Sequence, residues 1–263
     1  MKAGSAPLWL VCIVTLIAES SPAFAQTDAE MNAANNPLQP SVSLNLQNIY
    51  IDSYYGLRDV DGNNGLLRGS TPHKLFGKPL LMRATLPIVT TPDLPPTGSQ
   101  TDVGDLNLFD LLLMKAGKFE LGLGPQLTLP TAGRDETGTG KWQAGLAFLA
   151  IGPRHWGILG SLVTWQHSFA GDSDRRTQNN LQAQPLVIFN LPRGWYLRST
   201  ATWTWDLHEG TYYLPVGAGV GKVWKPSAAT WNVFVEPQWT LAHDGDGVPE
   251  FQIYAGLNLQ FPL

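Results

Sequence analysis

The residues with the clearest capacity for covalent chemistry are a few serines and histidines. His167 and Ser168 are neighbours in the sequence; Ser161 precedes them and Ser199 follows them. A hydrolase needs a hydroxyl nucleophile within hydrogen-bond reach of a histidine base. Adjacent residues of a strand point to opposite faces, and no Gly-x-Ser-x-Gly turn is present. We therefore predict no enzyme and no catalytic residue, with a membrane-lipid hydrolase kept as a less favoured alternative.

Two acidic stretches have residue types that could bind calcium, Asp59–Asn63 and Asp244–Asp246. The first begins like a calcium-binding loop, but Ser70 stands where a bidentate glutamate belongs. The run from Gly217 to Lys222 has the glycines of a phosphate loop without the Ser or Thr that should follow the lysine. Glycines at close strand contacts explain it better. We predict neither a metal nor a cofactor, and leave calcium binding by loops open.

The remaining polar residues alternate with apolar ones along extended segments. The pattern of these segments says more about the function than any single reactive side chain does. The last stretch, from Glu250 to Leu263, shows this best: Phe251, Ile253, Ala255, Leu257, Leu259 and Phe261 share one face of an extended strand, whereas Gln252, Tyr254, Gly256, Asn258 and Gln260 share the other. Such alternation over about 11 residues suits a strand between lipid and water. It also resembles the C-terminal assembly signal of bacterial outer-membrane barrels, although Pro262 and Leu263 follow the final aromatic.

The first 25 residues have the pattern of a cleaved secretory signal peptide. Lys2 is the basic residue, Leu8–Ala18 the apolar core and Ala23–Ala25 the cleavage site, so that Gln26 would begin the mature chain. Cys12, the only cysteine, lies inside this segment, which excludes disulfides and thiol chemistry from the remainder. Only 14% of the residues are charged, and the net charge of −4 argues against nucleic acid as a partner.

The rest of the chain divides into a tail and about twelve strand-like segments. Residues 26–40 are predicted to be a flexible periplasmic tail, and residues 41–263 an all-β, transmembrane antiparallel β-barrel. The predicted strands are 41–54, 64–75, 77–90, 103–115, 118–130, 142–153, 156–169, 180–191, 194–206, 211–224, 230–241 and 250–261. Short turns alternate with longer polar loops between them, as in outer-membrane barrels. An even number of strands places both termini at the short-turn rim.

The alternation also predicts which polar side chains face the lumen and set its selectivity. They are Arg83, Asp105, Glu120, Gln126, Arg198, Asp206, Glu236 and Gln252. Charges of both signs could line a water-filled path, or they could pair across the lumen and close it. Residues 156–169 are apolar on both faces, and Phe109 and Leu111 share a face with Asp105, so either the lumen is partly apolar or the register slips there.

Several blocks resemble, in order and spacing, one bacterial outer-membrane family. These are GLGPQLTLPTAGRDETGTGKW (122–142), SFAGD with Asp174-Arg175, NLPRGWYL (190–197) and PVGAGVGKVWK (215–225). The family is that of the meta-pathway of phenol degradation proteins, also described as putative transporters. The resemblance covers about residues 41–263 and implies an outer-membrane barrel that moves small, aromatic or hydrophobic compounds. It brings no binding residues to carry over.

These observations together predict a bacterial outer-membrane channel for passive uptake of small molecules, aromatic or hydrophobic ones among them. Its expected partners are outer-membrane lipid, the barrel-assembly machinery, contacted through the C-terminal strand, and the solute itself. The alternative is a closed structural or adhesive barrel that acts through its long outer loops. The solute, the openness of the lumen and the oligomeric state do not follow from the residues.

Overall fold

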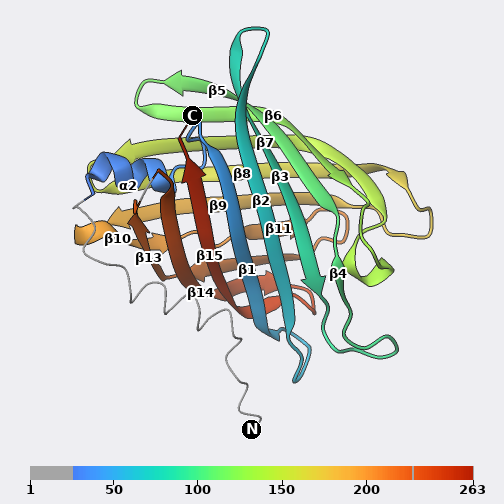
Figure 1. The fold of residues 1–263 in the computed structure, drawn as a ribbon. Coiled ribbons are helices and arrows are strands. Elements are labelled where there is room, and N and C mark those ends of the chain that lie inside the picture. The colour runs from blue at the N-terminus through green and yellow to red at the C-terminus, as the bar shows by residue number, and fades with distance from the viewer. Residues whose placement is uncertain (1–25, 227, 263) are drawn as a thin grey trace.

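The computed structural model describes residues 26–226 and 228–262, and within them the chain forms one closed antiparallel β-barrel. The signal peptide predicted for residues 1–25 lies outside the described residues. In the described part of the chain, no helix is long and apolar enough to span a membrane. Figure 1 shows the strands wrapping around a common interior, with helix α2 (Asp28–Asn35) at one end.

The strands follow the predicted segments closely. They are β1 (Val42–Tyr54), β2 (Gly62–Leu75), β3 (Lys78–Thr90), β4 (Thr101–Val103), β5 (Leu106–Ala116), β6 (Phe119–Leu129), β7 (Lys141–Arg154), β8 (Gly157–Gly171), β9 (Asn179–Asn190), β10 (Trp195–Ser199), β11 (Trp203–Asp206), β12 (Tyr212–Gly217), β13 (Gly219–Trp224), β14 (Thr230–Asp244) and β15 (Pro249–Phe261). Two short 3-10 helices, Asp135–Thr137 and Pro192–Gly194, lie between strands. The predicted all-β fold is confirmed.

Three of the twelve barrel strands are divided into two segments each, namely β4 with β5, β10 with β11, and β12 with β13. Each strand pairs with its neighbours in the sequence, and β1 pairs with β15 from Val42↔Phe261 to Tyr54↔Pro249. This last pairing closes the sheet. Closure removes the free strand edges, whose backbone N–H and C=O groups would find no hydrogen-bond partner in hydrocarbon.

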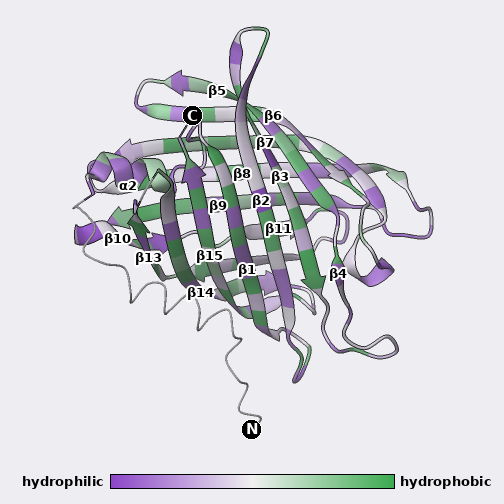
Figure 2. Ribbon diagram, in the orientation of Figure 1, coloured by the Kyte–Doolittle hydropathy of each residue, from purple (hydrophilic) through white to green (hydrophobic). Residues whose placement is uncertain are grey.

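The alternation of residue types decides which face of each strand is outermost. On β15, Gln252 and Tyr254 are buried in the interior, whereas Phe261 is 40% exposed. Many other outward side chains are large and apolar; Leu46, Leu146, Leu159, Leu197, Trp239 and Leu241 are among them. Figure 2 shows hydrophilic and hydrophobic residues alternating along these strands. An apolar outer belt over a more polar interior is the arrangement of a barrel that spans a membrane.

The connections at the two rims differ in length, as predicted. Strands β2 and β3 are joined at one rim by Phe76 and Gly77 alone, both with positive φ, which suits a two-residue hairpin turn. At the opposite rim, residues 91–100 and 130–140 form much longer connections. We call these the short-turn rim and the long-loop rim. Because the strand number is even, the described ends of the chain both lie at the short-turn rim.

The segment before β1 differs from the predicted flexible tail. Residues 28–35 form helix α2, which begins with a capping box: Thr27 and Glu30 each accept a hydrogen bond from the other's backbone N–H. The bonds that Glu30 receives from Thr27 lower the pKa of its carboxyl. Met31 is 1% exposed and Leu38 is 3% exposed, because both pack inside the barrel. The prediction of a flexible tail is therefore wrong for this segment.

Helix α2 explains why several strands are apolar on their inner face. Met31 and Leu38 belong to one buried cluster with Phe109 and Leu111 of β5, and with side chains from β7, β8 and β9. The apolar residues that made the facing of β5 uncertain point inward to meet this helix. Of the two readings left open by the sequence, the partly apolar lumen is the one confirmed.

Candidate functional site

The barrel interior holds two cavities above the apolar cluster. The first, of about 140 Å³, lies beside the α2 segment and is lined by polar groups and by Leu81, Phe109, Leu162 and Leu186. The second, of about 320 Å³, extends to Asp105 near the long-loop rim and is lined mainly by Gln, Asn and Thr. Arg68 and Arg83 line both cavities. The two arginines therefore stand where the cavities meet.

The short-turn end of the interior is narrowed by α2 and the chain that follows it. Asn232 of β14 donates from Nδ2 to the Ala34 carbonyl at 3.2 Å and to Asn35 Oδ1 at 2.9 Å. On the other side of the helix, Asn32 donates to the Arg154 carbonyl at 2.8 Å. These bonds tie the helix to opposite parts of the wall, so the helix obstructs part of the axial path, and the first cavity continues beside it to Ser43 and Gln260 near the short-turn rim.

The structure distributes the eight predicted lumen residues over four environments. Arg83, Asp105, Gln126 and Arg198 line the cavities. Glu120 lies at the short-turn end, where its Oε2 accepts from Asn36 Nδ2 at 2.6 Å. Asp206 lies at the long-loop end and binds Arg176. Glu236 and Gln252 are buried in the wall network. Their inward placement follows the alternation, and their role in selectivity stays a prediction.

Residues 200–202, between β10 and β11, are outside the ladder on both sides: pairing with β9 stops at Ser199↔Val187 and resumes at Trp203↔Ala183, and pairing with β12/β13 is interrupted as well. β10 pairs with β13 from Trp195↔Lys222 to Arg198↔Gly219, and β11 pairs with β12 at Thr204↔Tyr213 and Trp205↔Tyr212. Between these pairings, Ser199–Trp203 faces Leu214–Ala218 without a ladder. The two paired halves keep the same register, because continued pairing from Arg198↔Gly219 would arrive at Thr204↔Tyr213. The ladder could therefore close without moving any strand along its neighbour.

Prolines explain why the ladder stops here. Pro215 of β12 lies inside the unpaired segment and has no N–H to donate. Side chains satisfy the backbone groups that are left over: Trp203 Nε1 donates to the Pro215 carbonyl at 3.1 Å, and Gln184 Nε2 donates to the Thr200 carbonyl at 2.8 Å. The gap is thus an opening whose polar groups are paired by other means.

Glu236 closes the gap from the inside. Its side chain is fully buried and accepts from Arg198 Nε at 2.6 Å and from the Thr200 backbone N–H at 2.7 Å. Thr200 Oγ1 and Gln238 Nε2 donate to the same carboxylate at 2.7 and 3.1 Å. A Cβ at Gly217 would overlap this carboxylate, so glycine makes room for it. We call Glu236, Arg198 and Thr200 the latch.

The outer face of the gap carries an apolar depression of about 610 Å³. Val187 and Phe189 of β9, Leu197 of β10, and Ala218 and Val220 opposite line it. Arg198 lines this depression as well as the inner cavity beside α2. Arg198 of the latch therefore lies between the inner cavity and an apolar site on the outer wall.

Two of these features were missed at the level of sequence. The segment from Leu66 to Leu75 alternates poorly, which hid the inward direction of Arg68, although its apolar neighbour Leu67 is 42% exposed on the outer face. The segments 194–206 and 211–224 were predicted as unbroken strands, and the structure divides both. Pro215 beside Gly217 and Gly219 was the available signal. The prediction that these glycines serve close strand contacts is consistent with the crowding at Gly219.

His167 and Ser168 point to opposite faces of β8, as expected for adjacent residues of a strand. His167 is exposed on the outer face, whereas Ser168 is buried inside and donates no hydrogen bond to a histidine; its Oγ accepts from the Gln178 backbone N–H at 3.0 Å. Within the described residues, no group of three or more His, Cys, Asp or Glu side chains could hold a metal ion.

Fold and interior together define the class of protein as a transmembrane β-barrel of the bacterial outer-membrane type. Among solved structures, an outer membrane channel from Pseudomonas putida F1 is similar, with a TM-score of 0.62 and 18% identity over 86% of this chain and 97% of that one. At this identity, the likeness shows a common fold.

Two other similar structures are more distant. The KdgM porin has a TM-score of 0.47 and 10% identity over 84% of this chain and 99% of that one. Outer membrane phospholipase A from Escherichia coli has a TM-score of 0.35 and 13% identity over 88% and 97%. No family model matches the chain, and no curated protein matches it. The resemblance to the phenol-degradation family thus stays a sequence-based expectation.

Proposed function

We propose that this chain is an outer-membrane channel for passive uptake of small, largely apolar molecules, and that the solute leaves the lumen sideways through the gap between β10/β11 and β12/β13. The long-loop rim faces the outside of the cell in this proposal, and the short-turn rim faces the periplasm. The structural likeness to an outer membrane channel supports the general role.

The single observation that carries the lateral route is the run of cavities across the wall. The two inner cavities share Arg68 and Arg83, and the one beside α2 shares Arg198 with the outer depression. The axial exit is partly obstructed by α2, while the lateral exit is an unpaired stretch of strand in continuous register. An apolar solute that takes this route passes from a partly apolar lumen directly into the hydrocarbon of the membrane. Such a solute does not need a wide water-filled pore.

The test fills the outer depression and measures entry of a neutral apolar probe. Ala218→Trp places a large side chain in the depression, because Ala218 lines it and is exposed. The matched control is Leu241→Trp, since Leu241 is 74% exposed on the outer face of β14 and lies outside the depression. Uptake of N-phenylnaphthylamine by cells that carry each variant at equal surface levels should fall several-fold for Ala218→Trp and stay unchanged for the control.

A second arm holds the gap shut. Ala201 and Val216 would be opposite each other if the ladder closed, and the chain after Cys12 has no cysteine to interfere. Oxidation of an Ala201→Cys, Val216→Cys variant should stop probe uptake, and reduction should restore it. Uptake that is unaffected both by the cross-link and by Ala218→Trp would eliminate the lateral route. Uptake no greater than that of cells lacking the protein would favour the closed structural barrel.

A further inference from the structure

We propose that Arg68 and Arg83 form a binding site for an organic carboxylate with an apolar body, so that the channel prefers weak acids of this kind among apolar solutes. The inference rests on the proposed function, because it names the class of solute that the same interior would take. The argument comes from the position, charge and surroundings of the two arginines.

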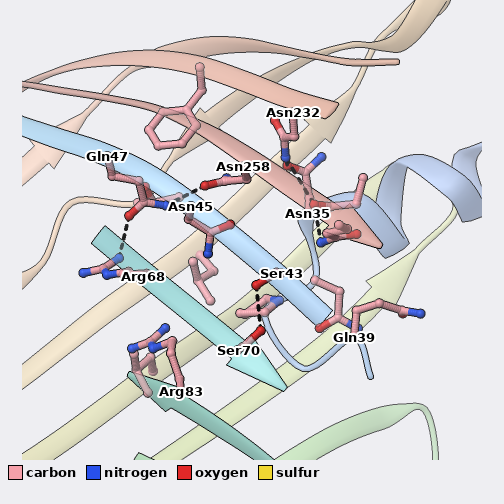
Figure 3. A pocket seen from close by; sticks show the side chains of 18 of the residues that line it. Asn35, Gln39, Ser43, Asn45, Gln47, Arg68, Ser70, Arg83, Asn232 and Asn258 are labelled. Atoms are coloured by element: carbon pink, nitrogen blue, oxygen red, sulfur yellow. Dashed lines mark hydrogen bonds between the residues drawn. The ribbon is translucent and has the colours of Figure 1, made fainter. Parts of the chain in front are cut away.

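The two side chains reach the same space from neighbouring strands. Ser70 of β2 pairs with Arg83 of β3, and Arg68 pairs with Thr85, so the arginines are diagonal neighbours on the inner face. Figure 3 shows both side chains beside the network that runs from Gln47 to Asn258. Both line the two inner cavities. Any solute that moves between the cavities must pass them.

The positive charges of this pair have no carboxylate partner in the described part of the chain. No Asp or Glu oxygen lies within 4.0 Å of either guanidinium, in contrast to Arg198, which binds Glu236 at 2.6 Å. Arg68 Nη1 donates to Gln47 Oε1 at 2.6 Å, and Arg83 stacks 3.9 Å from the centre of the Phe109 ring. The Nε atoms of both arginines are buried and bond to no described residue.

Two neighbouring guanidinium groups without a counter-charge are costly inside a protein, and an anion that binds both relieves this cost. Arginine presents its N–H groups in a planar fork that fits the two oxygens of a carboxylate. The Nε donors of both arginines are unpaired among the described residues, so each fork still lacks an acceptor. The site is therefore suited to a carboxylate better than to a neutral polar group.

The apolar side chains around the arginines explain why the anion should carry an apolar body. Leu81, Phe109, Leu162 and Leu186 line the same small cavity as the two arginines. A simple inorganic anion would leave this apolar wall in contact with water, whereas an aromatic or aliphatic acid would cover it. Amide side chains such as Gln184 complete the lining and add no charge.

The experiment measures binding to the detergent-solubilised full chain by calorimetry, with benzoate, its neutral isostere benzamide and the cation benzylamine as probes. Benzoate should bind, and Arg83→Met should weaken it by about tenfold or more, because charge-assisted hydrogen bonds are lost. Arg83→Lys keeps the charge and should recover part of the affinity. Arg193→Gln is the matched control, since it removes one exposed positive charge at the short-turn rim.

Equal binding of benzoate and benzamide would overturn the proposal, as would benzoate affinity that Arg68→Gln and Arg83→Met both leave unchanged. Acetate should bind more weakly than benzoate, and equal binding would remove the apolar body from the proposal. Because these measurements involve no transport, they are independent of the lateral route. If the cross-link blocks uptake but benzoate is not preferred, this inference is wrong and the proposed function stands. If benzoate is preferred but the cross-link leaves uptake unchanged, the proposed lateral route is wrong and this inference stands.

Discussion

At the scale of single residues, the latch differs from the role predicted for its members. Arg198 and Glu236 were predicted as lumen residues that set selectivity, and the structure pairs them with each other and with Thr200. Arg198 also lies 3.6 Å from the centre of the Phe234 ring. The charge of Arg198 is therefore neutralised at the wall. Of the described arginines that line the inner cavities, Arg68 and Arg83 have no such carboxylate partner, and Arg68 was not predicted.

Removing one partner of the latch should be much more costly than removing both. Glu236→Leu leaves the buried Arg198 without a counter-charge and the Thr200 N–H without an acceptor, which should reduce the free energy of unfolding by about 3–5 kcal/mol. Arg198→Met, Glu236→Leu in one chain should lose less, because no charge remains buried. Urea titration in detergent micelles, followed by tryptophan fluorescence, measures both. A double variant as unstable as the single one would contradict this account.

At the scale of elements, α2 decides how much of the barrel interior is open. Its apolar side packs against the apolar inner faces of β5 and β7–β9. Its Asn side chains form hydrogen bonds with β9 and β14. The wall itself does not depend on the helix, because every strand of the barrel pairs with two other strands.

Deletion of residues 27–38 should therefore open the axial path while the barrel still folds. Single-channel conductance in planar bilayers should rise several-fold, since the obstruction at the short-turn end is gone. Heat-modifiable migration on gels would show that the barrel is intact. Met31→Ala is the milder control, because it removes apolar contacts and leaves the helix in place. Unchanged conductance in the folded deletion variant would show that the obstruction lies elsewhere.

At the scale of the whole molecule, the apolar outer belt and the closed sheet depend on each other. The outward side chains include Leu146 in the middle of β7, which is 55% exposed. Such a surface is stable only against hydrocarbon, and only a closed sheet leaves no backbone group unpaired there.

A charge at the middle of the belt should be costly, and one at a loop should not. Leu146→Arg is expected to lower the free energy of unfolding in lipid bilayers by about 2–4 kcal/mol, as for arginine near the midplane of a membrane barrel. Leu94→Arg, in the connection at residues 91–100, should change it by less than about 1 kcal/mol. Denaturant titrations in liposomes compare the two, and equal costs would mean that the belt does not face hydrocarbon.

The sequence by itself determined the barrel. Alternation along Phe251–Phe261 and its counterparts fixes which face is apolar, because side chains of a strand alternate between its two sides. The turn and loop lengths then fix the order and the shared rim of the termini. The facing of each strand and the length of each turn are local properties, because they depend only on residues that are close together in the sequence.

The tertiary structure alone decided the state of the interior. Nothing in residues 26–40 shows that their few apolar side chains would find a matching cluster on the inner faces of β5, β7, β8 and β9, since each of those contacts joins residues far apart in the chain. The same holds for the latch, in which the Glu236 carboxylate accepts from the Thr200 N–H in place of a carbonyl of the neighbouring strand. Whether a lumen is open depends on such long-range pairs, and alternation describes only the wall around them.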